Sequence, residues 1–357
     1  MIDLLNLFEM SPFSLSKDEK TNVYLNALRE LTIWHYENCP EYRKILDFTQ
    51  FHVSKVTDIS EFPFIPVRLF KEYDLLSINK SDIVKTMTSS GTTGQKVSKI
   101  FLDKTTSTNQ TKALVKIISS FTGKKRLPML VIDSSSVLKD RNLFSARGAG
   151  ILGFSMIGHD LTYALDDQMK IDIDRIIFFV NKHKNETILL FGFTFMIWQY
   201  FYEELQRLNI RLPLENSLMI HGGGWKKLIS NSVDNQTFKH LFLEAHGISN
   251  IHDYYGMVEQ TGSIFMECEI GHLHASIFSD ILIRDLLSFK NLGFGEKGLI
   301  QLVSLLPVSY PGHSILTEDI GEILGEDDCK CGRKGKYFKV YGRIKNAEIR
   351  GCSDTYN

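Results

Sequence analysis

Short apolar segments alternate with helical segments through the middle of the chain, and this alternation limits the possible folds more than any other feature. Residues 129–132, 187–191 and 217–220 each have the length and apolar content of a buried strand. Between the last two, residues 195–208 have the length and spacing of a helix. Because strands that alternate with helices assemble into sheets covered by helices, the pattern predicts an α/β fold.

The segments on either side of this region have different patterns. Residues 18–38 repeat apolar side chains at helical spacing. A Phe-Pro-Phe-Ile-Pro run at 62–66 then interrupts the pattern, because proline fixes φ and removes a backbone donor. From about residue 255 to 343, frequent glycines between short apolar runs indicate a β-rich lobe. The expected parts are an N-terminal helical part (1–86), an α/β nucleotide-binding subdomain (87–254), the β-rich lobe (255–342) and a short C-terminal tail (343–357).

Composition argues against several classes of function. With 41 Lys and Arg against 42 Asp and Glu, the formal charge is −1, which speaks against a basic surface for nucleic acid. The first residues are acidic where a signal peptide is basic, and the longest apolar run, at 188–198, is shorter than a membrane span. Five cysteines, an odd number in 357 residues, argue against a disulfide framework. We expect a cytoplasmic protein with no nucleic-acid partner and no membrane span.

A run of small and hydroxyl residues at 88–94, between a polar strand and a helical segment, is the most informative motif. Glycine lets the backbone amides of such a loop turn into one concavity, and Ser and Thr hydroxyls add donors to phosphate oxygens. The spacing of the Walker A loop is missing. Taken alone, the run fits a phosphate-binding loop and a flexible surface turn equally well, and the motifs downstream favour the phosphate-binding loop. Its candidate residues are Ser89, Ser90, Gly91, Thr92, Thr93, Gly94 and Lys96.

Four further motifs have the chemistry of a nucleotide site. In the first, three glycines at the end of a strand let a flat ligand lie against bare backbone. In the second, an aromatic ring can stack on a purine, and a carboxylate four residues later can hold Mg²⁺. The third is an acidic turn suited to ribose hydroxyls, with a solvated turn as its alternative, and the fourth contains an arginine. In chain order they are His221-Gly222-Gly223-Gly224-Trp225, Asp253-Tyr254-Tyr255-Gly256-Met257-Val258-Glu259, Thr317-Glu318-Asp319-Ile320-Gly321 and Tyr341-Gly342-Arg343-Ile344-Lys345.

Four of the five cysteines fall into two groups with different chemistry. Cys329 and Cys331 lie two residues apart, and Cys268 and His274 lie together some 60 residues upstream. Thiolate and imidazole ligands suit tetrahedral Zn²⁺, but the spacing is not that of a standard finger, so buried free thiols are the alternative. Cys352 follows several cationic residues in the tail, and nearby cations lower the pKa of a thiol. An incidental thiol in a frayed tail is the alternative there.

Taken together and in this order, the motifs resemble those of the adenylate-forming superfamily of acyl-CoA synthetases, firefly luciferase and nonribosomal adenylation domains. The finer likeness is to the acyl-protein synthetase (LuxE-type) family, at residues 221–227, 254–269, 305–321, 329–338 and 343–356. The resemblance implies the large domain of an adenylate-forming enzyme, mixed sheets with flanking helices and a β-rich lobe, with most of the usual C-terminal domain missing. It implies ATP-dependent activation of a carboxylic acid, in this family a fatty acid, to an acyl-adenylate. Transfer to the enzyme's own Cys352 and on to a partner such as an acyl reductase would follow.

The resemblance also implies roles for single residues. The loop from Ser89 to Gly94, with Lys96, would bind the phosphates of ATP, and Thr92 and Thr93 would act in catalysis. Glu259 would hold Mg²⁺, although Val258 stands where the superfamily motif has Thr. The lysine of the missing domain has no counterpart, and sequence does not decide what replaces it. Adenine and ribose would be held by Gly222, Gly223, Gly224, Asp253, Tyr255, Gly256, Asp319 and Arg343.

Relatives of the phenylacetate-CoA ligase type carry a similar CxCGR segment with structural zinc. That likeness favours zinc over free thiols at Cys268, His274, Cys329 and Cys331, and the GxLH register favours His274 over His272.

Two other functions stay open. One is a free-standing acid–CoA ligase of the phenylacetate type, against which the 14 residues after Arg343 count. The other is a non-catalytic nucleotide-binding scaffold, against which the presence of Glu259, Asp319 and Arg343 counts.

Overall fold

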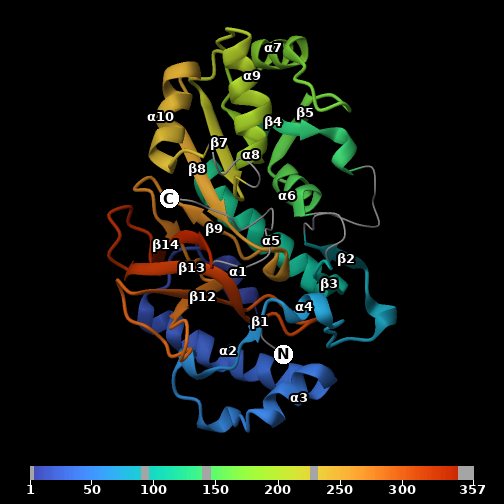
Figure 1. Cartoon of the computed structure of the whole chain (residues 1–357), viewed down its shortest axis with the longest axis vertical. Coiled ribbons are helices and arrows are strands. Elements are labelled where there is room, and N and C mark those ends of the chain that lie inside the picture. Colours follow the sequence, from blue (N-terminus) through green and yellow to red (C-terminus); the bar gives the residue numbers. More distant parts are fainter. Residues whose placement is uncertain (1–3, 90–95, 139–145, 226–231, 345–357) are drawn as a thin grey trace.

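The computed structural model describes residues 4–89, 96–138, 146–225 and 232–344 of the chain (Figure 1). Twelve strands form one sheet: β1 (Ile65–Pro66), β4 (Leu127–Ser134), β5 (Gly158–Leu165), β6 (Ile188–Phe193), β7 (Ser217–Gly222), β8 (Asn250–Tyr255), β9 (Phe265–Glu267), β10 (Leu273–His274), β11 (Ser279–Arg284), β12 (Lys297–Ser304), β13 (Ser314–Glu326) and β14 (Lys336–Arg343). Their order is β11-β12-β13-β14-β10-β9-β8-β7-β6-β4-β5, and β1 pairs with β13. A separate hairpin contains β2 (Lys85–Thr88) and β3 (Lys99–Leu102).

One half of the large sheet is parallel and has helices on both faces. Its strands pair in the order β5-β4-β6-β7-β8. Because successive side chains of a strand point to opposite faces, Leu189 and Leu190 of β6 enter two different apolar cores. The first core contains α5 (Lys104–Thr122) and α6 (Ala146–Ser155), and the second contains α7 (Ile173–Lys182), α9 (Glu203–Arg207) and α10 (Asn235–His246). The predicted α/β fold and its three strands are confirmed.

The predicted helix over 195–208 is confirmed, with an irregular middle. It consists of α8 (Thr194–Met196), a π-helical segment, η5 (Ile197–Tyr202), and α9. The π-helical turns carry Trp198, whose ring packs edge-on against Trp225 after β7. Among the helices of the described ranges, none has both the length and the apolar character needed to cross a membrane.

The other half of the sheet is antiparallel and contains β9 to β14. Its longest strand, β13, has 13 residues and pairs with both β12 and β14. This half confirms the predicted β-rich lobe. The predicted boundary after residue 254 falls inside β8, and the sheet continues across it through the pairing of β8 with β9. The four-part division of the chain stays a prediction.

The N-terminal region is helical, as the sequence predicts. Its helices are α1 (Leu5–Glu9), α2 (Lys17–Asn38), α3 (Pro40–Phe48) and α4 (Leu69–Glu72). Figure 1 shows α2 and α3 at the end of the molecule opposite α7, α9 and α10. Ser16 and Glu19 form a capping box at the start of α2, which satisfies backbone donors that the helix itself leaves unpaired.

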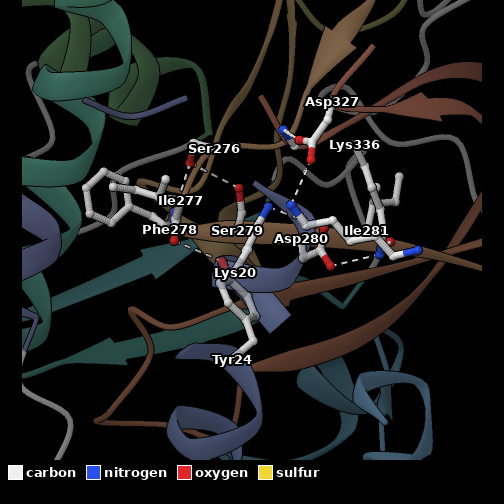
Figure 2. A network of polar contacts seen from close by, with 12 residues as sticks. Lys20, Tyr24, Ser276, Ile277, Phe278, Ser279, Asp280, Ile281, Asp327 and Lys336 are labelled. Carbon is white, nitrogen blue, oxygen red and sulfur yellow. Dashed lines mark hydrogen bonds and ion pairs between the residues drawn. The ribbon is translucent and has the colours of Figure 1, made fainter. Parts of the chain in front are cut away.

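A buried polar network fastens the start of α2 to the antiparallel half of the sheet (Figure 2). The Asp280 carboxylate lies 3.3 Å from Lys20 Nζ and, through its other oxygen, 2.8 Å from Lys336 Nζ. The backbone N–H of Lys17 donates to Asp327 Oδ2 at 2.8 Å. One carboxylate therefore holds a cation from α2 and a cation from β14, and Asp327 ties α2 to the turn between β13 and β14.

Candidate active site

The predicted phosphate loop joins the two strands of the β2–β3 hairpin. Ser89 N–H donates to the carbonyl oxygen of Ser98 (3.1 Å), and Ser98 N–H donates back to Ser89 Oγ (2.9 Å), so the base of the loop is closed. The prediction that a helical segment follows the loop directly is wrong, because β3 pairs with β2 before α5 begins. Lys96 is exposed and lies 3.0 Å from Glu72 Oε2. Outside the described residues lie Ser90, Gly91, Thr92, Thr93 and Gly94.

The fold itself explains why glycine is needed at two positions at the end of β7. A Cβ at Gly222 would lie 2.5 Å from Cε1 of Tyr254, so glycine here lets the neighbouring strand β8 bring its ring close. Gly223 has a φ of 77°, which side chains other than glycine rarely adopt. Gly222, Gly223 and Gly224 are all buried. Their predicted contact with a flat ligand stays a prediction.

Neighbouring residues at the end of β8 face two different pockets. Tyr254 lines an apolar pocket together with Gly256, and Asp253 lines a small polar pocket. Asp253 Oδ1 lies 3.7 Å from Nδ1 of His221 and has no hydrogen-bond partner among the described residues. Burial raises the pKa of Asp253 well above its usual value, and the charge of Glu267 raises it further. A buried polar atom of this kind is suited to receive a donor from a ligand.

His221 contributes a neutral imidazole to the same region. Burial lowers its pKa to about 3, with further lowering by the charge of Lys239. Its Nδ1 lies 3.0 Å from Thr194 Oγ1 at the start of α8. Sequence reasoning placed His221 in a motif but gave it no role, because its partner Thr194 lies 27 residues away on another element.

Tyr255, predicted to contact adenine, and the candidate ribose residues Asp319 and Arg343 form a chain of contacts across the sheet. Tyr255 OH donates to Asp319 Oδ2 (2.6 Å), and Arg343 Nε lies 3.4 Å from Asp319 Oδ1. The acidic turn expected at Thr317–Gly321 is wrong, because these residues lie within β13, where Asp319 pairs with Arg343. The Tyr255 ring is fully buried, so the predicted stacking on adenine would require the ring to become exposed first.

Glu259 lies in a hydrogen-bonded turn shortly after β8. It belongs to a 3₁₀ segment, η7 (Val258–Gln260), and is 2% exposed. Its carbonyl oxygen accepts from Tyr310 OH at 2.8 Å, and Gln260 Nε2 donates to the carbonyl oxygens of Leu302 (3.1 Å) and Gly312 (2.8 Å). These bonds hold the turn in place. A carboxylate is a ligand that Mg²⁺ prefers, so Glu259 fits the predicted role.

The apolar pocket opens beside this turn. Counting its mouth, the space between its walls is about 570 Å³, and most of the lining surface is apolar. Phe154 and Tyr254, which lie on one side, pack against each other with ring centroids 5.2 Å apart. Gly150 of α6 also lines the pocket, and a Cβ there would lie 3.4 Å from the ring of Phe193. The apolar lining suits an apolar ligand.

The four predicted metal ligands lie together, although they come from two hairpins. One nitrogen or sulfur atom from each of Cys268, His274, Cys329 and Cys331 lies within 4.8 Å of all the others. Cys268 Sγ and Cys329 Sγ are 4.0 Å apart, and Cys331 Sγ is 3.4 Å from His274 Nε2. His272, the competing imidazole, lies outside this set, with its Nδ1 3.5 Å from Cys329 Sγ.

Burial and hydrogen bonds shift the pKa values of the four side chains in this cluster. Burial lowers the pKa of His274 to about 4, so its imidazole is neutral and able to ligate. Burial raises the pKa of Cys268 and raises that of Cys329 to about 12. At Cys331 burial raises the pKa, but hydrogen bonds, among them those from Arg333, lower it by more. The pKa of Cys331 therefore falls below its usual value. A metal would supply the charge that turns the first two thiols into thiolates.

Comparison with known proteins gives the family. The family model described as "Acyl-protein synthetase, LuxE" matches residues 1–357. The chain is 26% identical to a long-chain-fatty-acid–luciferin-component ligase of Aliivibrio fischeri over 97% of this chain and 91% of that one. It is 23% identical to the Vibrio harveyi ligase of the same name over 97% of this chain and 90% of that one.

Solved structures show the same fold at lower identity. A 2-hydroxyisobutyryl-CoA ligase in its postadenylation state superposes with a TM-score of 0.73 at 14% identity, covering 94% of this chain and 70% of that one. An amide bond synthetase from Marinactinospora thermotolerans superposes with a TM-score of 0.52 at 15% identity, covering 78% and 52%. The fold is therefore that of these ligases. With the family model matching along the whole sequence, the chain belongs to the acyl-protein synthetase (LuxE) family.

Proposed function

We propose that this protein uses ATP to activate a fatty acid as an acyl-adenylate and then transfers the acyl group to its own Cys352. The apolar pocket beside the Gly256–Glu259 turn is the observation that carries the proposal. An acyl chain in that pocket would place its carboxylate next to Glu259 and the end of β8. The luciferin-component ligases named above are long-chain-fatty-acid ligases, which supports a fatty acid as substrate.

The residues around the pocket would divide the work of adenylation. Gly222 to Gly224 and Asp253 would receive adenine, Asp319 and Arg343 the ribose, and the loop from Ser89 to Gly94 the phosphates. A carboxylate oxygen of the fatty acid attacks the α-phosphorus, and pyrophosphate leaves with the bridging oxygen. Mg²⁺, held by Glu259, would supply positive charge to the phosphates. Fixed donors and charges of this kind lower the barrier because they need no reorganisation during the reaction.

Cys352 would then accept the acyl group. Its thiolate attacks the carbonyl carbon of the mixed anhydride, a thioester forms, and AMP leaves. A further acceptor, such as an acyl reductase, would take the group from the thioester. Cys352 lies outside the described residues, so the family resemblance and the cations before it in the sequence support this step.

Structural zinc is the second part of the proposal. Three thiols and one imidazole would fill a tetrahedral site completely, which is typical of zinc that stabilises a fold and does not act in chemistry. Elemental analysis of protein purified without chelators should find about one zinc per chain, as such sites bind tightly. Reduced thiols of this kind persist in the cytoplasm, which we propose as the compartment.

Pyrophosphate exchange over a series of fatty acids tests the activation step. We expect exchange that depends on ATP and an acid, and that improves with chain length until the pocket is full. Covalent labelling of the protein by the acid in the absence of CoA separates this function from that of a free-standing acid–CoA ligase. No exchange with any acid would contradict the proposal and leave the non-catalytic scaffold.

A further inference from the structure

Glu267, the last residue of β9, joins three parts of the molecule that sequence reasoning does not connect. Its side chain is 2% exposed. It directly precedes Cys268 of the Cys/His cluster, and its carboxylate reaches both α10 and the end of β8. In the adenylation reaction as derived above it has no role.

Within the described part of the chain, this carboxylate accepts three hydrogen bonds. Asn235 Nδ2 donates to Oε1 at 2.5 Å, and Lys239 Nζ donates to Oε2 at 2.8 Å. The backbone N–H of Asp253 donates to Oε2 at 2.9 Å. A carboxylate only accepts, so it satisfies three donors that converge on it, and the ion pair with Lys239 compensates for its burial.

The bond to the Asp253 N–H fixes a residue that the proposed function places against adenine. Asp253 N–H is held by a side chain of the next strand, so the placement of β9 sets the position of Asp253. The end of β9 is in turn set by the hairpin of the Cys/His cluster, where Cys268 N–H donates to the His272 carbonyl oxygen at 2.8 Å. A continuous path of contacts therefore runs from the cluster to the polar pocket.

We propose that Glu267 is a positioning residue that links the Cys/His cluster to the adenine-reading end of β8. The inference rests on the proposed function, because it takes Asp253 as the residue that receives the adenine amino group. The inference goes beyond that function because it gives the Cys/His cluster an influence on the preference of the enzyme for ATP over GTP. Guanine carries an oxygen acceptor where adenine carries the amino donor. A displaced Asp253 should therefore weaken ATP binding more than GTP binding.

The ratio of the dissociation constants for ATP and GTP, measured by titration calorimetry, tests this link. A ratio of dissociation constants does not depend on the fraction of folded protein, so general destabilisation leaves it unchanged. In Glu267→Ala we expect the preference for ATP to fall by about tenfold, because a buried hydrogen bond that fixes the reading group is lost. An unchanged preference in Glu267→Ala would overturn the proposal.

Two variants separate positioning from a general structural role. In Glu267→Gln the new amide oxygen can accept from Lys239 and Asp253, while Asn235 can turn its amide so that Oδ1, which has no partner among the described residues, accepts from the new NH₂. This variant should keep the preference within about threefold of the wild type, as expected when the hydrogen bonds survive. Asp280→Asn, which breaks a buried ion pair whose members do not line the polar pocket, should leave the preference unchanged. A fall in the preference of Asp280→Asn equal to that of Glu267→Ala would contradict the proposal.

Removal of the metal tests the other end of the path. Cys331→Ser should lose zinc and lose part of the preference for ATP. A metal-free Cys331→Ser protein with the full preference for ATP would refute the link to the cluster.

Pyrophosphate exchange by the wild type, measured in parallel, distinguishes failure of this inference from failure of the proposed function. If the wild type exchanges pyrophosphate but the variants keep the wild-type preference for ATP over GTP, only the inference is overturned. If the wild type exchanges no pyrophosphate, the proposed function is overturned, and the inference with it.

Discussion

Replacing Asp280 with asparagine should destabilise the protein strongly, because it removes the carboxylate that pairs with both Lys20 and Lys336 in the network of Figure 2. The side chains of Asp280 and Lys20 are each 3% exposed, and that of Lys336 is 12% exposed. Burial opposes ionisation of Asp280, but the charges of Lys20 and Lys336 prevail and hold its pKa below the usual value. The carboxylate is therefore ionised at neutral pH, and asparagine leaves both cations without a countercharge from this position.

The expected loss follows from this geometry. Breaking a buried ion pair costs about 3–5 kcal/mol, because the remaining charge stays desolvated. With an unfolding entropy of about 2.1 cal/mol/K per residue, this loss corresponds to a fall in Tm of about 4–7 °C for a chain of 357 residues. Lys20→Met should cost much less, since Asp280 keeps Lys336 as its partner.

Scanning calorimetry gives the Tm, and urea unfolding gives the free energy of unfolding, for each single variant and for the double variant. In the double variant Lys20→Met with Asp280→Asn, one of the two stranded cations is gone, so the double variant should be more stable than Asp280→Asn alone. If the two losses of stability were additive, the double variant would instead be less stable than Asp280→Asn alone. A loss below about 1 kcal/mol for Asp280→Asn, the value of an exposed pair, would refute the reasoning.

Three further predictions concern the pocket, the metal-binding carboxylate and the response to acid. Glu259→Gln keeps the shape of the turn but removes a metal-binding charge, so pyrophosphate exchange should slow by about a hundredfold or more, and an unchanged rate would contradict the role. Gly150→Leu should fill the pocket beside Phe193 and shift exchange toward shorter acids, and a wild-type chain-length profile would place the acyl chain elsewhere. Burial lowers the pKa of His313 to about 3, and burial with the charge of His313 holds that of His35 well below its usual value. Because both pKa values are lower in the folded than in the unfolded protein, the stability that these histidines contribute is complete above about pH 6.5 and is lost as the pH falls. In His313→Gln the slope of unfolding free energy between pH 6 and 5 should therefore be shallower by about 1.2 kcal/mol per pH unit, and an equal slope would show that His313 does not titrate there.

Local patterns predicted those parts of the fold that local chemistry determines. The strands at 129–132, 187–191 and 217–220 and the helix at 18–38 are confirmed, because apolar spacing decides them over a few residues. The strand β3 was missed because its pairing with β2 depends on a partner across a loop of ten residues, 89–98. The acidic segment around Asp319 reads as a turn in isolation, and only its pairing with two other strands makes it a strand.

In the candidate site, too, some features could be predicted from the sequence and others could not. Cys268, His274, Cys329 and Cys331 could be grouped from sequence because few residue types bind zinc, and the structure brings the four together. The role of Glu267 could not be predicted, because its three donors lie on α10 and β8, between 14 and 32 residues away in the chain. Its position next to Cys268 was the one available signal. The apolar pocket also has no sequence signature, since its lining residues come from α5, α6, the end of β6 and the segment from 254 to 264.

The central claim is that the protein forms an acyl-adenylate and passes the acyl group to its own Cys352, and one labelling experiment tests it most directly. The wild type and Cys352→Ser are incubated with ATP, Mg²⁺ and a labelled fatty acid, and the denatured proteins are then treated with neutral hydroxylamine, which cleaves thioesters. Serine has no thiolate near neutral pH and is a much weaker unaided nucleophile. We predict a hydroxylamine-labile label on the wild type and none on Cys352→Ser, while both proteins release pyrophosphate when the acid is present. An equal, equally labile label on Cys352→Ser would contradict the assignment of the acceptor, and pyrophosphate release from neither protein would contradict the activation step itself.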